Sequence, residues 1–244
     1  MRKTTAYIVT VALLLMSGCD NTNFDCVKKA GDNTTVELSL PPFHSININD
    51  GINVILKSGN VQEVRLTAGE NLIAGIKLSV DEEGFLNIYN ANNCNWIRSY
   101  RDINLHLTLD TLVRINHYGF GRLSSEGVVT FNNFTVNIQD GTGDVRLEVD
   151  NEKLYIVNNS IANCYISGQT NDFIVGYYYN DGICEAEELS AKRVSINHLG
   201  TNTIAVNPSE YLTGSLQSSG DIVYQGNPEK IEVNVTGTGT LRKK

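Results

Sequence analysis

Apolar and polar residues alternate in short segments along most of this chain, and turns rich in glycine, asparagine and aspartate separate the segments. One pair of such segments, 134–138 and 145–149, flanks the turn Gly141-Thr142-Gly143-Asp144. A period of two places every second side chain on one face of a β-strand, and no stretch after the first 18 residues shows the 3.6-residue period of a helix. The pattern predicts an all-β body with almost no helix.

The turn recurs about every twenty residues, with a second glycine or an asparagine in its place. These positions are Gly121, Gly143, Asn163, Gly182, Asn202, Gly220 and Gly239. A fixed period with two strand-like segments is typical of a solenoid, because one coil cannot bury its apolar face alone. A leucine-rich repeat and a β-propeller fit less well, because the first needs regular leucines and the second a period of about forty residues. The repeat predicts a right-handed parallel β-helix of about ten coils over residues 36–242.

The start of the chain has the composition of an export signal. Arg2-Lys3 precedes an apolar stretch at 6–16 that is too short to span a membrane as a stable helix. Small residues then lead directly to Cys19, as in the bacterial lipobox, where the cysteine is acylated; an ordinary secretory signal followed by a chance cysteine is the alternative. We predict a lipoprotein signal peptide at 1–18 and a lipidated tether at 19–35.

This anchor predicts a location in the bacterial cell envelope. Acyl chains on the cysteine would hold the chain in a membrane, which we predict to be the outer membrane, with the body at its periplasmic face or at the cell surface. The net charge is −8, with 19 Lys and Arg against 27 Asp and Glu, and no basic stripe is present. Nucleic acids are therefore excluded as expected partners, and docking onto an anionic membrane surface is disfavoured.

Assignment of Cys19 to lipid leaves four cysteines in an exported domain, Cys26, Cys94, Cys164 and Cys184, which allow three pairings. Cys164 and Cys184 lie on successive repeats in nearly the same register, so a bridge between neighbouring coils is one hypothesis, and Cys26 with Cys94 is the pair that remains. The alternative is that some of them are buried free thiols.

Several segments of the chain resemble the putative autotransporter adhesin, head GIN domain family, which is common in exported lipoproteins of Bacteroidetes. They are Pro42-Phe43-His44-Ser45-Ile46, Asp50-Gly51-Ile52-Asn53-Val54, the Cys94–Tyr100 segment and the closing Ser218–Pro228 segment. The similarity covers about residues 40–240, and the closing segment is its most specific part. The resemblance implies a right-handed β-helix in the cell envelope, and it implies no established activity.

No motif for catalysis, phosphate binding or calcium binding is found in the sequence. Aspartates beside the turn glycines do not form a row, because equivalent turn positions hold arginine, cysteine, isoleucine and threonine, so these aspartates are expected to cap turns. The histidines have no metal-ligand spacing, and we expect them at the surface or at coil corners: His44, His106, His117 and His198. No cofactor and no metal site are predicted.

Two aromatic clusters are candidates for ligand binding. The segment around the only tryptophan gathers Trp96, Arg98, Tyr100 and Arg101, and flat aromatics beside guanidinium groups suit sugar or peptide surfaces. These aromatics could instead plug an end or a corner of the solenoid. Strand alternation directs Tyr178 outward if Tyr177 points into the core.

The sequence therefore favours a non-enzymatic, lipid-anchored binding or adhesin-like domain that contacts glycans or proteins at the bacterial surface. Two other classes remain open. A polysaccharide-active β-helix enzyme would show carboxylates with Lys or Arg on one face. A structural envelope protein that self-associates as a homo-oligomer would show an exposed apolar patch at a coil end, although the charged residues 242–244 would act against edge pairing there.

Overall fold

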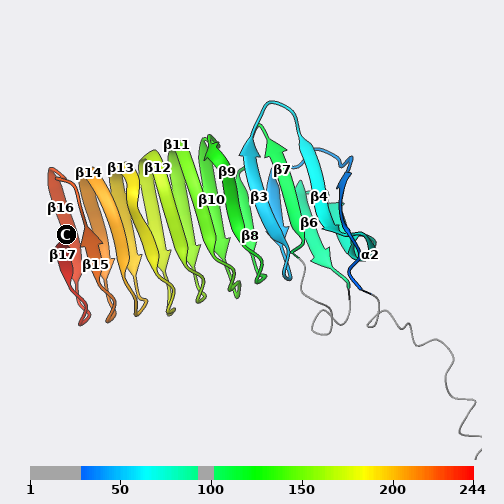
Figure 1. Ribbon diagram of the computed structural model, residues 1–244. Coiled ribbons are helices and arrows are strands. Elements are labelled where there is room, and N and C mark those ends of the chain that lie inside the picture. The colour runs from blue at the N-terminus through cyan, green and yellow to red at the C-terminus, as the bar shows by residue number, and fades with distance from the viewer. Residues whose placement is uncertain (1–28, 93–101) are drawn as a thin grey trace, which may run out of the picture.

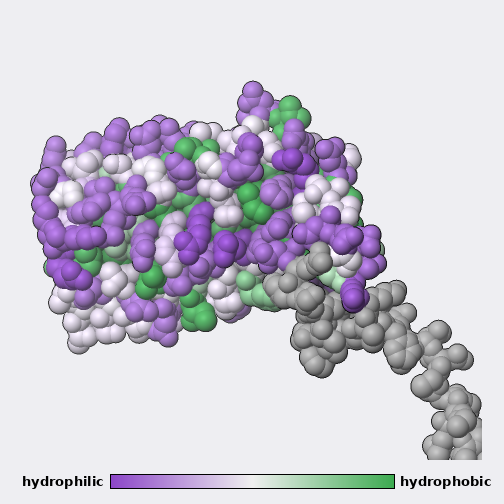
Figure 2. Space-filling view, viewed as in Figure 1, coloured by the Kyte–Doolittle hydropathy of each residue, from purple (hydrophilic) through white to green (hydrophobic). Residues whose placement is uncertain are grey.

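The computed structural model describes residues 29–92 and 102–244, and in this part the chain is an elongated stack of β-strands (Figure 1), with mostly polar residues on the face shown in Figure 2. Within these two ranges the strands form one 17-stranded sheet, with a single short helix after the fourth strand. The elements are β1 (Asn33–Glu37), β2 (Ser45–Ile48), β3 (Asn53–Ser58), β4 (Glu63–Gly69), α2 (Glu70–Ile73), β5 (Ile76–Val80), β6 (Phe85–Asn90), β7 (Asn104–Leu109), β8 (Arg114–His117), β9 (Leu123–Val129), β10 (Asn133–Ile138), β11 (Val145–Asn158), β12 (Cys164–Tyr177), β13 (Cys184–His198), β14 (Ile204–Leu216), β15 (Ile222–Tyr224), β16 (Lys230–Val235) and β17 (Leu241–Lys243). The predicted all-β parallel β-helix is confirmed.

Inward side chains of successive coils stack in columns that form one continuous core. Parallel pairing aligns Phe134 of β10 with Leu154 of β11, and then with Phe173, Val194 and Leu212 of the following three strands. All five side chains are at most 1% exposed. The period-two alternation read from the sequence therefore marks the buried face of each coil correctly.

The N-terminal third departs from a simple coil-by-coil progression. Strands β2 and β3 are paired on one side with β6 and β7 and on the other with β8 and β9, so the first coil in sequence lies second in space. Strands β1, β4 and β5 are antiparallel and cover the outer side of this end. Because β1, β4 and β5 form no parallel coils, the solenoid has fewer turns than the ten that the repeat predicted.

The N-terminal end of the solenoid is closed by this antiparallel layer. Ala30 and Leu72 are buried in it at 2% and 4% exposure, and β1 begins at Asn33. Residues 29–35, which the sequence assigned to the tether, thus belong to the folded body. No helix among the described residues has the length and apolar character needed to cross a lipid bilayer.

Buried polar side chains occupy one corner column, which the sequence analysis did not predict. Asn158 donates to the carbonyl of Ala162 at 2.8 Å, the Tyr177 hydroxyl donates to the carbonyl of Ile183 at 2.9 Å, and His198 contacts the carbonyl of Asn202 at 2.8 Å. Each side chain reaches across the turn that follows its own strand and satisfies a backbone carbonyl there. His117 and His198 lie at coil corners, as expected, and both are fully buried there, which the sequence analysis did not predict.

An asparagine ladder runs along the outer face of β6, β2, β8 and β10. Asn47 accepts from Asn116 at 2.9 Å and donates to Asn87 at 2.8 Å, and Asn116 accepts from Asn137 at 3.3 Å. Each of these asparagines lies between two inward apolar or histidine positions. The ladder pairs amides between neighbouring coils, so it stabilises the stack on its solvent side.

Candidate functional site

Four of the five binding residues that the sequence predicted lie outside the described residues, as does Cys19. These four are Trp96, Arg98, Tyr100 and Arg101. The fifth, Tyr178, is half-buried and points outward, but its ring lies across Gly176, whose position leaves no room for a side chain beneath the ring. The amide of Asn197 donates to the Tyr178 hydroxyl at 3.1 Å. This side chain covers a glycine on the sheet surface as well as facing solvent.

The exposed aromatic of this turn is the next residue, Tyr179. It is 86% exposed and its φ is 52°, a left-handed conformation that costs a β-carbon-bearing residue about 1–2 kcal/mol. The length of the turn accounts for this left-handed conformation, because the turn after β12 has six residues where most of the other turns have five. Counting turn residues in the sequence would have identified Tyr179 as the additional one.

Cys164 and Cys184 are register partners on β12 and β13, as the repeat predicted, but both are buried free thiols. In parallel in-register pairing their side chains point the same way into the core, and a disulfide needs the two β-carbons directed toward each other. Burial raises the pKa of the Cys164 thiol to about 12 and raises that of Cys184 as well, so neither thiol is reactive near neutral pH. Cys26 and Cys94 lie outside the described residues.

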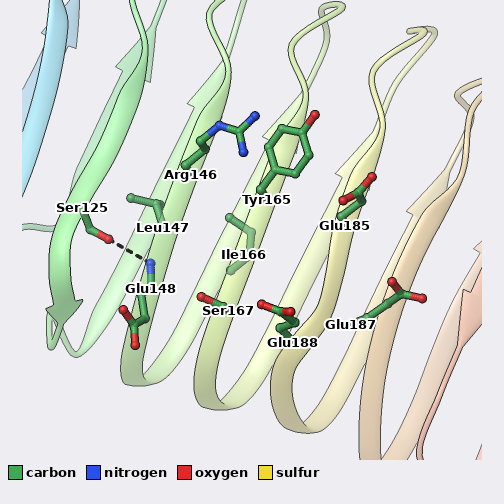
Figure 3. A pocket seen from close by; sticks show the side chains of 10 residues that line it. All are labelled: Ser125, Arg146, Leu147, Glu148, Tyr165, Ile166, Ser167, Glu185, Glu187 and Glu188. Atoms are coloured by element: carbon green, nitrogen blue, oxygen red, sulfur yellow. Dashed lines mark hydrogen bonds between the residues drawn. The ribbon is translucent and has the colours of Figure 1, made fainter.

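A groove lies on the other broad face of the solenoid, across β9, β11, β12 and β13 (Figure 3). It has a volume of about 430 Å³, in the range of small-ligand sites. Its lining residues are Ser125, Arg146, Leu147, Glu148, Tyr165, Ile166, Ser167, Glu185, Glu187 and Glu188. Leu147 and Ile166 belong to the buried core, so a rigid apolar layer lies beneath the groove, whose own surface is mostly polar.

Unequal strand lengths create the groove. Between two matched pairs, β13 holds one more residue than β12, and opposite β14 it holds the three additional residues 187–189. Such β-bulges bend a strand and redirect its side chains. The carboxylates of Glu187 and Glu188 come from this bulge, so the acidic character of the groove depends on a local break in the repeat.

One rim of the groove carries a stacked cation and aromatic ring. The Arg146 guanidinium lies 3.8 Å from the centre of the Tyr165 ring, and Asp144 holds the same guanidinium at 3.2 Å. Figure 3 shows Arg146, Tyr165 and Glu185 in a row along successive strands. The stacked arginine fixes the tyrosine ring, and the ring is half-buried with one edge toward the groove.

The opposite rim is acidic. Figure 3 places Glu148, Ser167 and Glu188 near one another, with the Ser125 hydroxyl accepting from the Glu148 backbone N–H at 2.9 Å. Glu187 is held from the C-terminal side by the Lys244 ammonium at 2.9 Å. Across the groove, four carboxylates thus stand against one arginine.

This arrangement can bind hydroxyl and ammonium groups. Carboxylates accept hydrogen bonds from sugar hydroxyls, a fixed tyrosine offers a flat face, and four negative charges disfavour an anionic ligand. Carboxylates beside an arginine are also the sign that would favour a polysaccharide-active enzyme. However, Glu148, Glu185 and Glu188 are all solvent-exposed, whereas a general acid needs a carboxyl that is shielded from water.

Sequence analysis missed this groove because its residues come from strands of successive coils, β9, β11, β12 and β13, and from the bulge in β13. The run Glu185-Ala186-Glu187-Glu188 was the available signal, since alternation fails there. Among the described residues, no group of histidine, cysteine, aspartate or glutamate side chains is arranged to hold a metal ion.

Known structures share this fold. A putative adhesin from Bacteroides fragilis superposes with a TM-score of 0.79 at 19% identity, covering 87% of this chain and 97% of that one. A putative lipid binding protein from Parabacteroides distasonis gives 0.67 at 18% identity, covering 88% and 97%. A putative adhesin from Parabacteroides merdae gives 0.66 at 16% identity, covering 89% and 98%. These likenesses establish the fold alone.

At the level of sequence, no curated protein matches the chain. The family model described as "Putative auto-transporter adhesin, head GIN domain" matches residues 42–228, which is most of the chain and includes every groove residue. With the parallel β-helix and its repeat already established, the match agrees with the resemblance seen in the sequence. The chain therefore belongs to the auto-transporter adhesin, head GIN domain family.

Proposed function

We propose that this chain is a non-enzymatic binding module of the bacterial cell envelope that holds a neutral or amino-sugar glycan in the groove across β9, β11, β12 and β13. The observation that carries the proposal is the combination of a fixed aromatic ring at Tyr165 with four surrounding carboxylates above a rigid apolar layer. Aromatic rings contact the apolar faces of sugars, while carboxylates take their hydroxyls.

Charge narrows the ligand class. Arg146 is the one cation lining the groove, and it is already engaged by Asp144 and by the Tyr165 ring. Glu187 is paired with Lys244, so an incoming carboxylate or sulfate would meet three unpaired carboxylates, at Glu148, Glu185 and Glu188, without a free positive partner among the lining residues. Hydroxyl-rich neutral sugars and protonated amino sugars meet no such repulsion.

The location is part of the same proposal. We infer a lipid anchor on Cys19 from the signal pattern, with the solenoid tethered at the outer membrane, facing the periplasm or the cell surface. The family assignment and the putative adhesins with this fold support an envelope location. Radiolabelled palmitate should label the wild-type chain and not the Cys19→Ala variant.

A glycan array tests the groove. The full chain should bind neutral and amino-sugar oligosaccharides and should leave carboxylated and sulfated ones unbound. Glu185→Gln, which removes one charge at constant size, should weaken amino-sugar binding more than neutral binding. Preference for anionic glycans, or unchanged binding by Tyr165→Ala, would overturn the assignment of the groove.

Product analysis of the same mixtures decides between binding and hydrolysis. The exposed carboxylates predict that every oligosaccharide is recovered intact after long incubation. Cleavage that stops in Glu148→Gln or Glu188→Gln would instead make the groove an active site and would refute the non-enzymatic function.

A further inference from the structure

The C-terminal end of the solenoid leaves its core uncovered. In β14 the inward residues Leu212 and Leu216 are 0% exposed, whereas their partners one coil later, Ile231 and Val235 of β16, are 40% and 43% exposed. Leu241 of β17 packs against the core and is only partly buried. The last coil thus presents apolar side chains that every earlier coil covers with a successor.

The same coil presents unpaired backbone groups. Thr236 donates its N–H to Leu216 of β14, and Lys244 donates its N–H to Tyr224 of β15. Because backbone groups alternate between the two sides of a strand, Ile231, Val233 and Val235 direct their N–H and C=O groups away from β14. Among the described residues, no strand pairs with this outer edge of β16 or β17.

The two ends of the solenoid differ in whether a further layer of strands covers them. The antiparallel layer of β1, β4 and β5 covers the N-terminal end, so an open last coil cannot continue into the first coil of another copy. An uncovered surface that meets only its own kind gives a two-fold dimer and not a filament. Two such dimers would add antiparallel strand pairs between copies: β17 can pair with β17, or β16 can pair with β17 of the second copy.

Charge distinguishes the two arrangements. Pairing β17 with β17 in the register that sets Leu241 opposite Lys243 places Arg242 of one copy opposite Arg242 of the other, which is unfavourable. Pairing β16 with β17 of the second copy, with the turn 236–240 at the same level in both, places Val235 opposite Leu241 and Asn234 opposite Arg242. Glu232 then faces Lys244, with Arg242 on its diagonal.

We propose that the chain forms a tail-to-tail dimer in which β16 of each copy pairs antiparallel with β17 of the other. The inward residues of the two last coils close over each other, and the edge-facing backbone groups are hydrogen-bonded across the two-fold axis. Arg242 and Lys244, which contact Asp221 and Glu187 within one chain, come next to Glu232 of the other copy, which contacts Lys230 within its own chain. Lys244 is thus near both the interface and the groove rim, but the tests of the two proposals substitute other residues, so the proposals fail or succeed separately.

Cysteine cross-linking tests the arrangement on the full chain in detergent. Asn234 and Arg242 form a predicted non-hydrogen-bonded pair, whose close approach suits a disulfide. Under mild oxidation the double variant Asn234→Cys with Arg242→Cys should become mostly a covalent dimer, while each single variant stays at the wild-type level. A double variant no more cross-linked than wild type, or Arg242→Cys alone cross-linking equally well, would overturn the proposal.

Sedimentation of the full chain gives a second measurement that needs no oxidation. Wild type should sediment as a dimer, and Glu232→Lys should raise the dimer dissociation constant about tenfold, because the dimer contains this contact twice. Glu229→Lys is the matched control, since Glu229 is exposed just before β16 and faces no residue of the second copy. A monomeric wild type, or equal weakening by both variants, would contradict the dimer.

Discussion

His117 should make this fold sensitive to acid. The side chain is fully buried, and neither ring nitrogen makes a hydrogen bond with good geometry. Its register partners in the neighbouring coils are Ile48 and Ile138, so the imidazole lies between two apolar side chains of the corner column. Burial lowers the pKa of His117 from 6.5 to about 4, and backbone groups at Gly121 and Gly143 oppose the shift only in part.

Stability should fall with falling pH, because the folded chain buries the neutral form of the imidazole. The unfolded chain takes up a proton near pH 6.5, while the folded chain resists protonation until about pH 4. The stability contributed by the neutral imidazole is therefore complete above pH 6.5 and is lost as pH falls through this window. The difference amounts to about 3 kcal/mol between pH 7 and pH 4.

Urea unfolding of the full chain, followed by circular dichroism at pH 7 and pH 4, measures this quantity. His117→Leu should leave the free energy of unfolding at pH 7 unchanged or higher, and should recover about 3 kcal/mol of the loss at pH 4. His106→Leu, on the outer face of β7, is the matched control for removing a histidine. The reasoning would be refuted if the free energy of unfolding fell equally from pH 7 to pH 4 in wild type and in His117→Leu. It would also be refuted if His117→Leu lowered this free energy by more than about 1 kcal/mol at pH 7.

Three further substitutions test separate parts of the fold by thermal unfolding. Gly143→Ala should cost more than about 2 kcal/mol, because its new β-carbon would lie 1.9 Å from the Gly121 carbonyl oxygen. Gly127→Ala should cost only about 1–2 kcal/mol, from its positive φ of 72°, because its β-carbon would meet no atom within 4 Å. Tyr179→Asn should raise stability by about 0.5–1 kcal/mol because asparagine tolerates its positive φ, and a loss of stability would contradict that origin. Phe173→Ala should cost about 3–5 kcal/mol, whereas Ile231→Ala at the open end should cost about 1; equal losses would mean that the end is covered.

The sequence predicted the regular part of the fold well, because alternation and turn spacing directly reflect which side chains a coil buries. Phe134, Phe173 and Val194 fall in one inward column because each has the same place in its repeat. The N-terminal third was not predicted in detail, since β1, β4 and β5 alternate in the same way whether they pair parallel or antiparallel. Strand pairing is a property of the tertiary fold and leaves little trace in a local pattern.

The candidate site was harder to predict for a related reason. Tyr165 and Arg146 are 19 residues apart, and their stacking depends on the register of β11 with β12. Glu187 and Glu188 become neighbours of these residues only through the β13 bulge. Local sequence placed the histidines at the surface or at coil corners but did not indicate burial, because the corner column, where His198 contacts a turn carbonyl, depends on how the coils stack.

The proposal of a glycan-binding groove has its most direct test in a calorimetric titration of the full chain with neutral and amino-sugar oligosaccharides. Wild type should bind at one site, Tyr165→Ala should lose at least tenfold in affinity, and Tyr211→Ala should bind as wild type does. Tyr211 is the matched control because it is a tyrosine, 39% exposed, on the opposite broad face. Equal affinities of the wild type and Tyr165→Ala, or a loss confined to Tyr211→Ala, would contradict the groove as the binding site.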